Sequence, residues 1–201
     1  MRTFTWRKGS LSKVNTCYVL AGGKSKRFGE DKLLYEIKGK KVIERVYETA
    51  KSVFKEVYIV AKDREKFSFL NAPVVLDEFE ESASIIGLYT ALKHAKEENV
   101  FVLSGDLPLM KKETVLYVLE NFKEPVSVAK TEKLHTLVGV YSKKLLEKIE
   151  ERIKKGDYRI WALLKDVGYN EVEIPEELRY TLLNMNTKED LKRILAIENH
   201  Y

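Results

Sequence analysis

The stretch Leu20–Lys32, LAGGKSKRFGEDK, decides the fold of this chain. It follows the apolar run Cys17–Leu20, which predicts a buried strand that ends in a loop. Three glycines in the stretch let backbone N–H groups approach a ligand closely, and successive N–H groups form a nest that binds anions. Its four basic residues are Lys24, Lys26, Arg27 and Lys32. The stretch therefore predicts a phosphate-binding loop after the first strand.

Two familiar phosphate-binding patterns do not match this loop. A Walker A loop needs a glycine followed five residues later by Gly-Lys, and the dinucleotide fingerprint needs Gly-x-Gly-x-x-Gly. Neither spacing occurs here. A glycine turn inside a solvated basic loop is the simpler alternative, but such a turn does not require four cations within nine residues. We therefore favour a phosphate-binding loop of another type.

The composition indicates a globular chain with a substantial core. Its 201 residues are 44% hydrophobic and 33% charged, and we expect a single domain over 1–201, with 1–13 as a loose arm or an extra edge strand. The apolar runs fall well short of the ~20 residues of a membrane span, and the N-terminus lacks the apolar stretch of a signal peptide. We therefore expect a cytoplasmic protein that does not associate with membranes.

The charge balance indicates an anionic small-molecule ligand more than a nucleic acid. The net charge is +5, and acidic and basic residues are interspersed along the chain, so no basic stripe for nucleic acid is evident. The single cysteine, Cys17, cannot form an internal disulfide, and its place in an apolar run predicts a buried side chain.

Strand-like and helix-like segments alternate along the chain. Strands are predicted at 16–20, 56–61, 73–76, 100–104, 126–130 and 137–141. Helices are predicted at 40–54, 84–97, 111–122, 142–156 and 187–200. This alternation predicts an α/β fold, a three-layer Rossmann-like architecture with a mostly parallel sheet and helices on both faces. Since ligands bind beyond the carboxyl ends of such strands, we expect 20–32 and the segments after Leu76 and Ser104 to share one crevice.

Asp106 is the leading candidate for a metal ligand. It follows the apolar strand 100–104 and precedes Leu107-Pro108, which prevents a helix from starting at once. A carboxylate beside a phosphate-binding loop is a place for Mg²⁺, which takes one or two carboxylates together with phosphate oxygens. The alternative is that Asp106 caps the following helix; the neighbouring basic loop favours the metal.

Further polar candidates lie at other strand ends. Asp77 closes the strand 73–76 and could accept hydrogen bonds from a base or ribose, or be an ordinary turn residue. Asn184 and Asn186 flank Met185, so in extended backbone their side chains point the same way and could position a polar ligand, although asparagines also serve turns and caps. His135 and Arg159 could contact a second substrate, with a surface role as the alternative for each.

Taken together, these residues resemble a known family. The family motifs are LAGG-x-x-x-R-x-G-x-D-K at the first loop, an aspartate at Asp77, G/C-D-x-P-x-L at Gly105–Met110, with Met110 in place of the last leucine, and N-x-N-T-x-E-D-L at Asn184–Leu191. They resemble the molybdenum cofactor guanylyltransferases, which are nucleotidyltransferases with a nucleotide-sugar-transferase-like fold. The resemblance runs from about Thr16 to about Ile194, and the chain departs from the family pattern at Phe28, Gly105 and 84–88.

The resemblance implies a reaction, its substrates and a set of site residues. It implies transfer of GMP from GTP to the terminal phosphate of molybdopterin, with Mg²⁺ as cofactor and with transient proteins that deliver the acceptor or receive the product. The residues that it implies for the nucleotide are Leu20, Ala21, Gly22, Gly23, Lys32, Asp77 and Asp106. Among these, Lys32 and Asp106 are the expected catalytic residues together with Arg27, and Asp106 is the expected metal ligand. Asn184 and Asn186 are expected at the substrate.

Two other functions remain open from the residues alone. A related nucleotidyltransferase could use CTP or another phosphorylated acceptor with the same fold and first loop. A non-catalytic nucleotide sensor is a second alternative, but a binding module does not need a metal carboxylate beside its phosphate loop.

Overall fold

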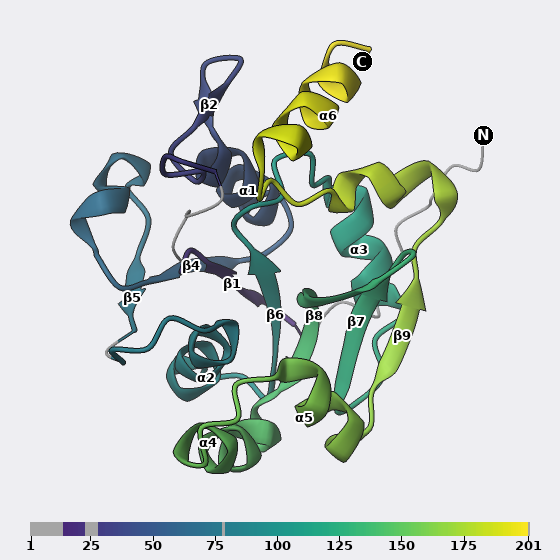
Figure 1. Ribbon diagram of the computed structural model, residues 1–201. Helices are drawn as coiled ribbons and strands as arrows, with labels where there is room; N and C mark the ends of the chain where they lie inside the picture. The colour runs from purple at the N-terminus through teal and green to yellow at the C-terminus, as the bar shows by residue number, and fades with distance from the viewer. Residues whose placement is uncertain (1–13, 23–27, 78, 201) are drawn as a thin grey trace.

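The computed structural model describes residues 14–22, 28–77 and 79–200. The arm expected over 1–13, and Gly23 and Arg27 of the first loop, lie outside the described residues. Figure 1 shows a central sheet with helices on both sides. This arrangement confirms the predicted α/β fold.

The central sheet has seven strands within the described residues. Their order across the sheet is β5 (Val74–Leu76), β4 (Glu56–Ala61), β1 (Thr16–Leu20), β6 (Asn99–Ser104), β8 (Leu134–Ser142), β7 (Val126–Lys130) and β9 (Asn170–Glu173). Strand β8 runs antiparallel to its neighbours β6 and β7, and the other pairs are parallel. The sheet is therefore mostly parallel, as predicted.

Helices cover both faces of this sheet. On one face lie α1 (Val42–Lys51) and α3 (Lys112–Glu120), and on the other lie α2 (Ser84–His94), α4 (Leu146–Lys154) and α5 (Ile160–Val167). Strand β1 is buried throughout because its successive side chains point to opposite faces that are both covered. Cys17 and Val19 pack on the α1 side, and Tyr18 and Leu20 pack on the α2 side.

A third cluster of buried side chains lies beyond the sheet. The C-terminal helix α6 (Lys188–Glu198) packs there with the two-stranded hairpin of β2 (Glu36–Ile37) and β3 (Lys40–Lys41). The short helical segments η1 (Glu65–Leu70), η2 (Lys143–Leu145) and η3 (Glu176–Leu182) complete the fold. Thr187 caps α6 by accepting a hydrogen bond from the backbone N–H of Asp190.

The order of the strands explains where a ligand binds. The chain runs outward from β1 through β4 to β5, and then crosses back by α2 to place β6 on the other side of β1. Leu20 and Ser104 therefore pair at the carboxyl ends of adjacent strands. In open α/β sheets such a reversal of strand order opens a crevice for ligands. The loop that follows β1 and Asp106, which follows β6, both start at this reversal.

Candidate active site

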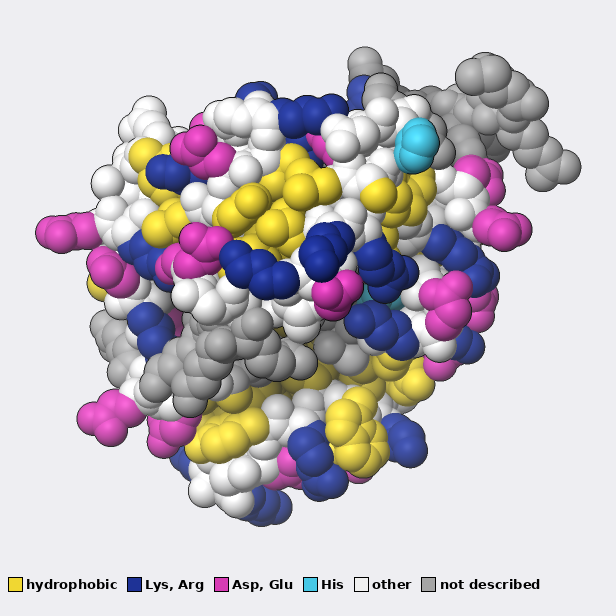
Figure 2. Space-filling view, turned by 45° about the horizontal axis from the view of Figure 1, so that its top comes forward, with side chains coloured by type: hydrophobic (Ala, Val, Ile, Leu, Met, Phe, Trp, Pro, Cys, Tyr) yellow, Lys and Arg dark blue, Asp and Glu magenta, His cyan; other side chains and the backbone are white. Residues whose placement is uncertain are grey.

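A cavity of about 340 Å³ lies at the carboxyl ends of β1, β4, β5 and β6. Its lining includes Leu20, Gly22, Lys32, Asp77, Asp106, Asn184 and Asn186, so the three segments expected to share a crevice do share one. Figure 2 brings this edge of the molecule forward and shows lysine and arginine side chains gathered across the middle of the face. The cavity therefore combines polar side chains with a basic surround.

Asp106 is the centre of the hydrogen-bond network in this cavity. Its Oδ1 accepts hydrogen bonds from Ser104 Oγ at 2.7 Å and Asn184 Nδ2 at 3.0 Å, and its Oδ2 accepts one from Lys32 Nζ at 3.1 Å. The carboxylate is nearly buried, with 12% of its side chain exposed. Helix α3 starts at Lys112 with Lys111 as its N-cap, so Asp106 does not cap it. The alternative role suggested by the sequence is therefore excluded.

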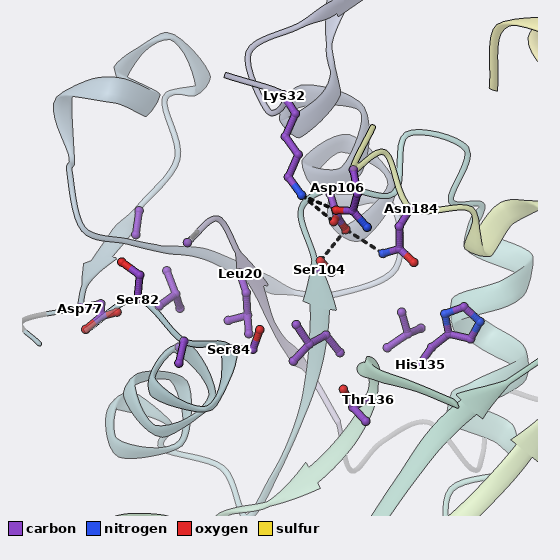
Figure 3. A pocket seen from close by; sticks show the side chains of 18 of the residues that line it. Leu20, Lys32, Asp77, Ser82, Ser84, Ser104, Asp106, His135, Thr136 and Asn184 are labelled. Carbon is purple, nitrogen blue, oxygen red and sulfur yellow. Dashed lines mark hydrogen bonds and ion pairs between the residues drawn. The ribbon is translucent and has the colours of Figure 1, made fainter. Parts of the chain in front are cut away.

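Lys32 connects two separate parts of the chain at the same point. Its Nζ donates to Asn186 Oδ1 at 2.5 Å as well as to Asp106, and 18% of its side chain is exposed. Figure 3 shows the lysine reaching in from one side to Asp106, while Asn184 reaches the same carboxylate from another side. A fixed ammonium at the edge of a cavity is suited to a phosphate, because little rearrangement is needed when the anion arrives.

The two asparagines point the same way, as the sequence predicted. Met185 between them is fully buried in the cluster under α6, and its N–H donates to the carbonyl of Asp106 at 2.8 Å. This pairing directs the Asn184 and Asn186 side chains toward Asp106 and Lys32. The asparagine amides therefore belong to the cavity, and the cap of α6 is provided by Thr187.

Asp77 lies on the other side of the cavity, directly after β5. Its Oδ2 pairs with Lys62 Nζ at 3.3 Å, its Oδ1 accepts from the N–H of Phe79 at 3.0 Å, and 8% of its side chain is exposed. Ser82 and Ser84 lie beside it at the start of α2, in the left part of Figure 3. Helix α2 has no side-chain cap, and the N–H of Ile86 in its first turn donates to the carbonyl of Ala83 at 3.0 Å.

The backbone positions the residues that begin the first loop. Leu20 and Ala21 have buried side chains, while Gly22 is exposed at the cavity. The N–H of Gly105 donates to the carbonyl of Leu20 at 2.9 Å, and an added Cβ at Gly105 would lie 2.8 Å from Ile43 Cδ1. A side chain at residue 105 would therefore have to displace the end of the Ile43 side chain where the two strand ends approach each other.

The sequence offers His135 and Arg159 as candidate contacts to a second substrate. Of these two residues, His135 lines the cavity and Arg159 does not. Only 7% of His135 is exposed, and its Nε2 is bonded to Thr131 Oγ1 at 2.8 Å. Burial, with a smaller contribution from the charge of Lys133, lowers the pKa of His135 to about 4, so the ring is neutral at pH 7. Arg159 instead pairs with Asp157 at the start of α5.

The cavity lining also includes three residues that were not predicted as site residues from the sequence, namely Ser104, Lys62 and Lys133. Ser104 had a signal, because it is the polar last residue of an apolar strand. Lys62 directly follows β4, just as Asp77 directly follows β5, so its position was a signal as well. Lys133 had no signal, because one lysine in a polar turn looks like any surface lysine.

Comparison with known proteins identifies the class first. The family model described as the MobA-like NTP transferase domain matches residues 17–172, so the chain is a nucleotidyltransferase. The chain belongs to this family of nucleotidyltransferases, in which its relatives are molybdenum cofactor guanylyltransferases.

These relatives cover most of the chain. A probable molybdenum cofactor guanylyltransferase of Thermococcus sibiricus is 38% identical, over 88% of this chain and 95% of its own length. One of Pyrococcus horikoshii is 36% identical, over 86% and 95%. The crystal structure of molybdopterin-guanine dinucleotide biosynthesis protein A from Archaeoglobus fulgidus superposes with a TM-score of 0.77 at 26% identity, covering 92% of this chain and all of the other.

Proposed function

We propose that this protein transfers GMP from GTP to the terminal phosphate of molybdopterin and releases pyrophosphate. Its family and the names of its relatives support this reaction. The observation that carries the proposal is the Lys32–Asp106 pair at the strand reversal, beside the first loop. The pair places a phosphate-binding cation and a potential metal ligand at one point in the crevice.

In this proposal the nucleotide occupies the part of the cavity between the first loop and Asp77. The backbone of Leu20, Ala21 and Gly22 borders the base, and Asp77 accepts hydrogen bonds from the nucleoside. Lys32 contacts the phosphates. Arg27 is assigned to the phosphates as well, and this assignment rests only on the resemblance to the family. The acidic Asp77 suits the N–H donors on the edge of guanine better than a phosphate, because like charges repel.

The chemistry requires alignment and charge neutralisation more than proton transfer. An oxygen of the acceptor phosphate attacks the α-phosphorus of GTP, a new P–O bond forms, and the bond to the bridging oxygen breaks as pyrophosphate leaves. The attacking oxygen is already ionised at neutral pH, so no general base is needed. The fixed ammonium of Lys32 opposes the charge that builds up on the phosphates.

The donor atoms around Asp106 fit Mg²⁺. The carboxylate of Asp106 and the amide oxygen of Asn186 are hard oxygen ligands, and Mg²⁺ usually completes its shell with waters and substrate phosphates. The described residues contain no group of three or more histidine, cysteine or acidic side chains that could hold a metal by themselves. Bound Mg²⁺ would supply charge neutralisation at the α-phosphate and the leaving pyrophosphate.

Location and partners are part of the proposal. No helix among the described residues is both long and apolar enough to cross a bilayer. We propose a cytoplasmic enzyme that draws on the GTP pool there, and that meets transient proteins supplying molybdopterin or accepting the dinucleotide.

The test compares GTP, CTP, ATP and UTP as donors with molybdopterin as acceptor. We expect pyrophosphate release and the guanine dinucleotide product with GTP at a rate at least tenfold above the other three. Equal rates with all four nucleotides would contradict guanylyl transfer, and a preference for CTP would identify a cytidylyltransferase. Binding of GTP without any release of pyrophosphate in the presence of acceptor would favour a nucleotide sensor.

A further inference from the structure

The cavity extends past Asp106 to a side that lies outside the position proposed for the nucleotide. In Figure 3 Asp77, Ser82 and Ser84 lie to the left of Asp106, while His135 lies to the right, below Asn184, and Thr136 lies below Asp106. His135 and Thr136 come from the start of β8. This strand is the antiparallel member of the sheet, so its first residues reach the edge where β6 ends.

Lys133 lies at this second side, close to the reaction centre. Its Nζ donates to Asn184 Oδ1 at 3.4 Å, and Nδ2 of the same amide donates to Asp106 Oδ1 at 3.0 Å. One side-chain amide therefore separates Lys133 from the Asp106 carboxylate. Lys133 forms no ion pair with a carboxylate of the described residues, so its charge is not used to hold the fold together.

His135 gives the same side a neutral polar wall. Its Nε2 is held by Thr131 Oγ1, and its buried ring adds no positive charge beside Lys133. Thr136 and Leu137 follow it on β8 and line the cavity further. A ligand with one phosphate and a neutral, polar, flat ring system would match a cation next to such a wall.

We propose that Lys133, Asn184 and His135 form the acceptor subsite, in which Lys133 binds the phosphate monoester of the acceptor and His135 borders its neutral ring. This inference rests on the proposed function, because it assigns the second substrate of that reaction. Lys32 then contacts Oδ2 of Asp106 directly, and Lys133 reaches Oδ1 of the same carboxylate through Asn184. One cation faces the nucleotide phosphates and the other faces the attacking phosphate.

The need for a second cation follows from the reaction. Two anions must meet, because the ionised acceptor phosphate attacks the α-phosphorus of GTP while the bond to pyrophosphate breaks. Lys133 reduces this repulsion by binding the ionised acceptor phosphate. The substitution of a lysine that binds only the acceptor weakens acceptor binding and leaves GTP binding unchanged.

The test separates the two substrates in one variant. In Lys133→Ala we expect the KM for molybdopterin to rise about 10-fold or more, as for a lost hydrogen bond between charged groups, with the Kd of GTP–Mg²⁺ within twofold of wild type. Lys133→Arg should recover most of the loss. The matched control is Lys154→Ala on α4, whose side chain is 75% exposed and outside the cavity, and it should change neither value.

A binding experiment without turnover keeps this inference separate from the proposed function. Protein saturated with α,β-methylene GTP and Mg²⁺ is titrated with inorganic phosphate while NMR follows the side-chain amide of Asn184. We expect this resonance to shift in wild type and in Lys154→Ala, and to stay unchanged in Lys133→Ala. If wild type makes no dinucleotide but this shift requires Lys133, the anion subsite stands and the proposed function fails.

Two results would overturn the acceptor subsite while leaving guanylyl transfer intact. The first is an unchanged molybdopterin KM in Lys133→Ala together with normal turnover by wild type. The second is a loss of GTP affinity as large as the loss for the acceptor, which would place Lys133 at the phosphates of the nucleotide. Thermal unfolding of each variant shows whether the fold is intact.

Discussion

Replacing Asp106 by asparagine tests the centre of the site, because the change keeps the shape and removes the charge. Asp106 accepts hydrogen bonds from Ser104, Asn184 and Lys32, and an asparagine oxygen retains part of this network. The variant loses the ion pair with Lys32, whose Nζ still donates to Asn186. We expect a loss of folding stability of about 1.5–3 kcal/mol, the size of one charge-assisted hydrogen bond.

The effect on turnover should be larger than the effect on stability. Removing one group that neutralises charge in a transition state typically lowers the rate by about 10²–10³, or about 3–4 kcal/mol. GTP binding without Mg²⁺ should be at least as tight in Asp106→Asn as in wild type, because a negative charge has left a cavity that binds an anion. The addition of Mg²⁺ should then tighten binding in wild type but not in the variant.

The assay measures GTP binding by calorimetry and transfer by pyrophosphate release, each across a Mg²⁺ titration. Asp166→Asn on α5 is the matched control, since its carboxylate is 63% exposed and outside the cavity, and it should leave both measurements unchanged. Wild-type turnover by Asp106→Asn at ordinary Mg²⁺ would refute the assignment of Asp106 as the metal ligand. Tightening of GTP binding by Mg²⁺ in the variant, equal to that in wild type, would refute it as well.

Three further outcomes are expected. Lys32→Ala should lower turnover about 100-fold or more while the melting temperature changes by only a few degrees, and thermal unfolding beside a transfer assay checks both. Gly105→Ala should lower stability by about 1–3 kcal/mol in urea unfolding, because its Cβ would meet Ile43 at 2.8 Å. The pKa of His135 is about 4 in the folded state and about 6.5 unfolded, so the stability it contributes is complete above pH ~6.5 and is lost as the pH falls toward 4. Urea unfolding at pH 7 and pH 4.5 should show about 2 kcal/mol more loss in wild type than in His135→Gln.

The fold could be predicted from the sequence because the strands β1, β4, β6 and β7 are largely buried on both faces. Such strands are short apolar runs, and helices with a clear apolar face separate them. The prediction missed β9 and α5. Strand β9 has one buried residue, Val172, and so carries too weak a pattern. Helix α5 did carry a signal, since Ile160, Leu163 and Leu164 follow helical spacing. Its eight residues were nevertheless not predicted as a helix, because only Arg159 was considered in this part of the sequence.

The candidate site was predictable where its residues follow strands directly. Asp77 comes after β5 and Asp106 two residues after β6, and the carboxyl ends of parallel strands meet at one edge. The acceptor side was not predictable in the same way. Lys133 lies before the antiparallel strand β8, and only the pairing of β8 with β6 brings the start of that strand to the same edge. Sequence spacing carries no information about that pairing.

The asparagines show how packing far from the chemistry can position the site. Asn184 lies 78 residues after Asp106, yet the N–H of Met185 donates to the Asp106 carbonyl, and the Met185 side chain is fully buried in the cluster below α6. This burial fixes the extended backbone there, and alternation then sends both flanking amides into the cavity. A smaller side chain at Met185 would leave a cavity in that cluster and loosen both amides. The C-terminal helix therefore acts on the reaction centre through one buried methionine, without contributing a side chain to the site.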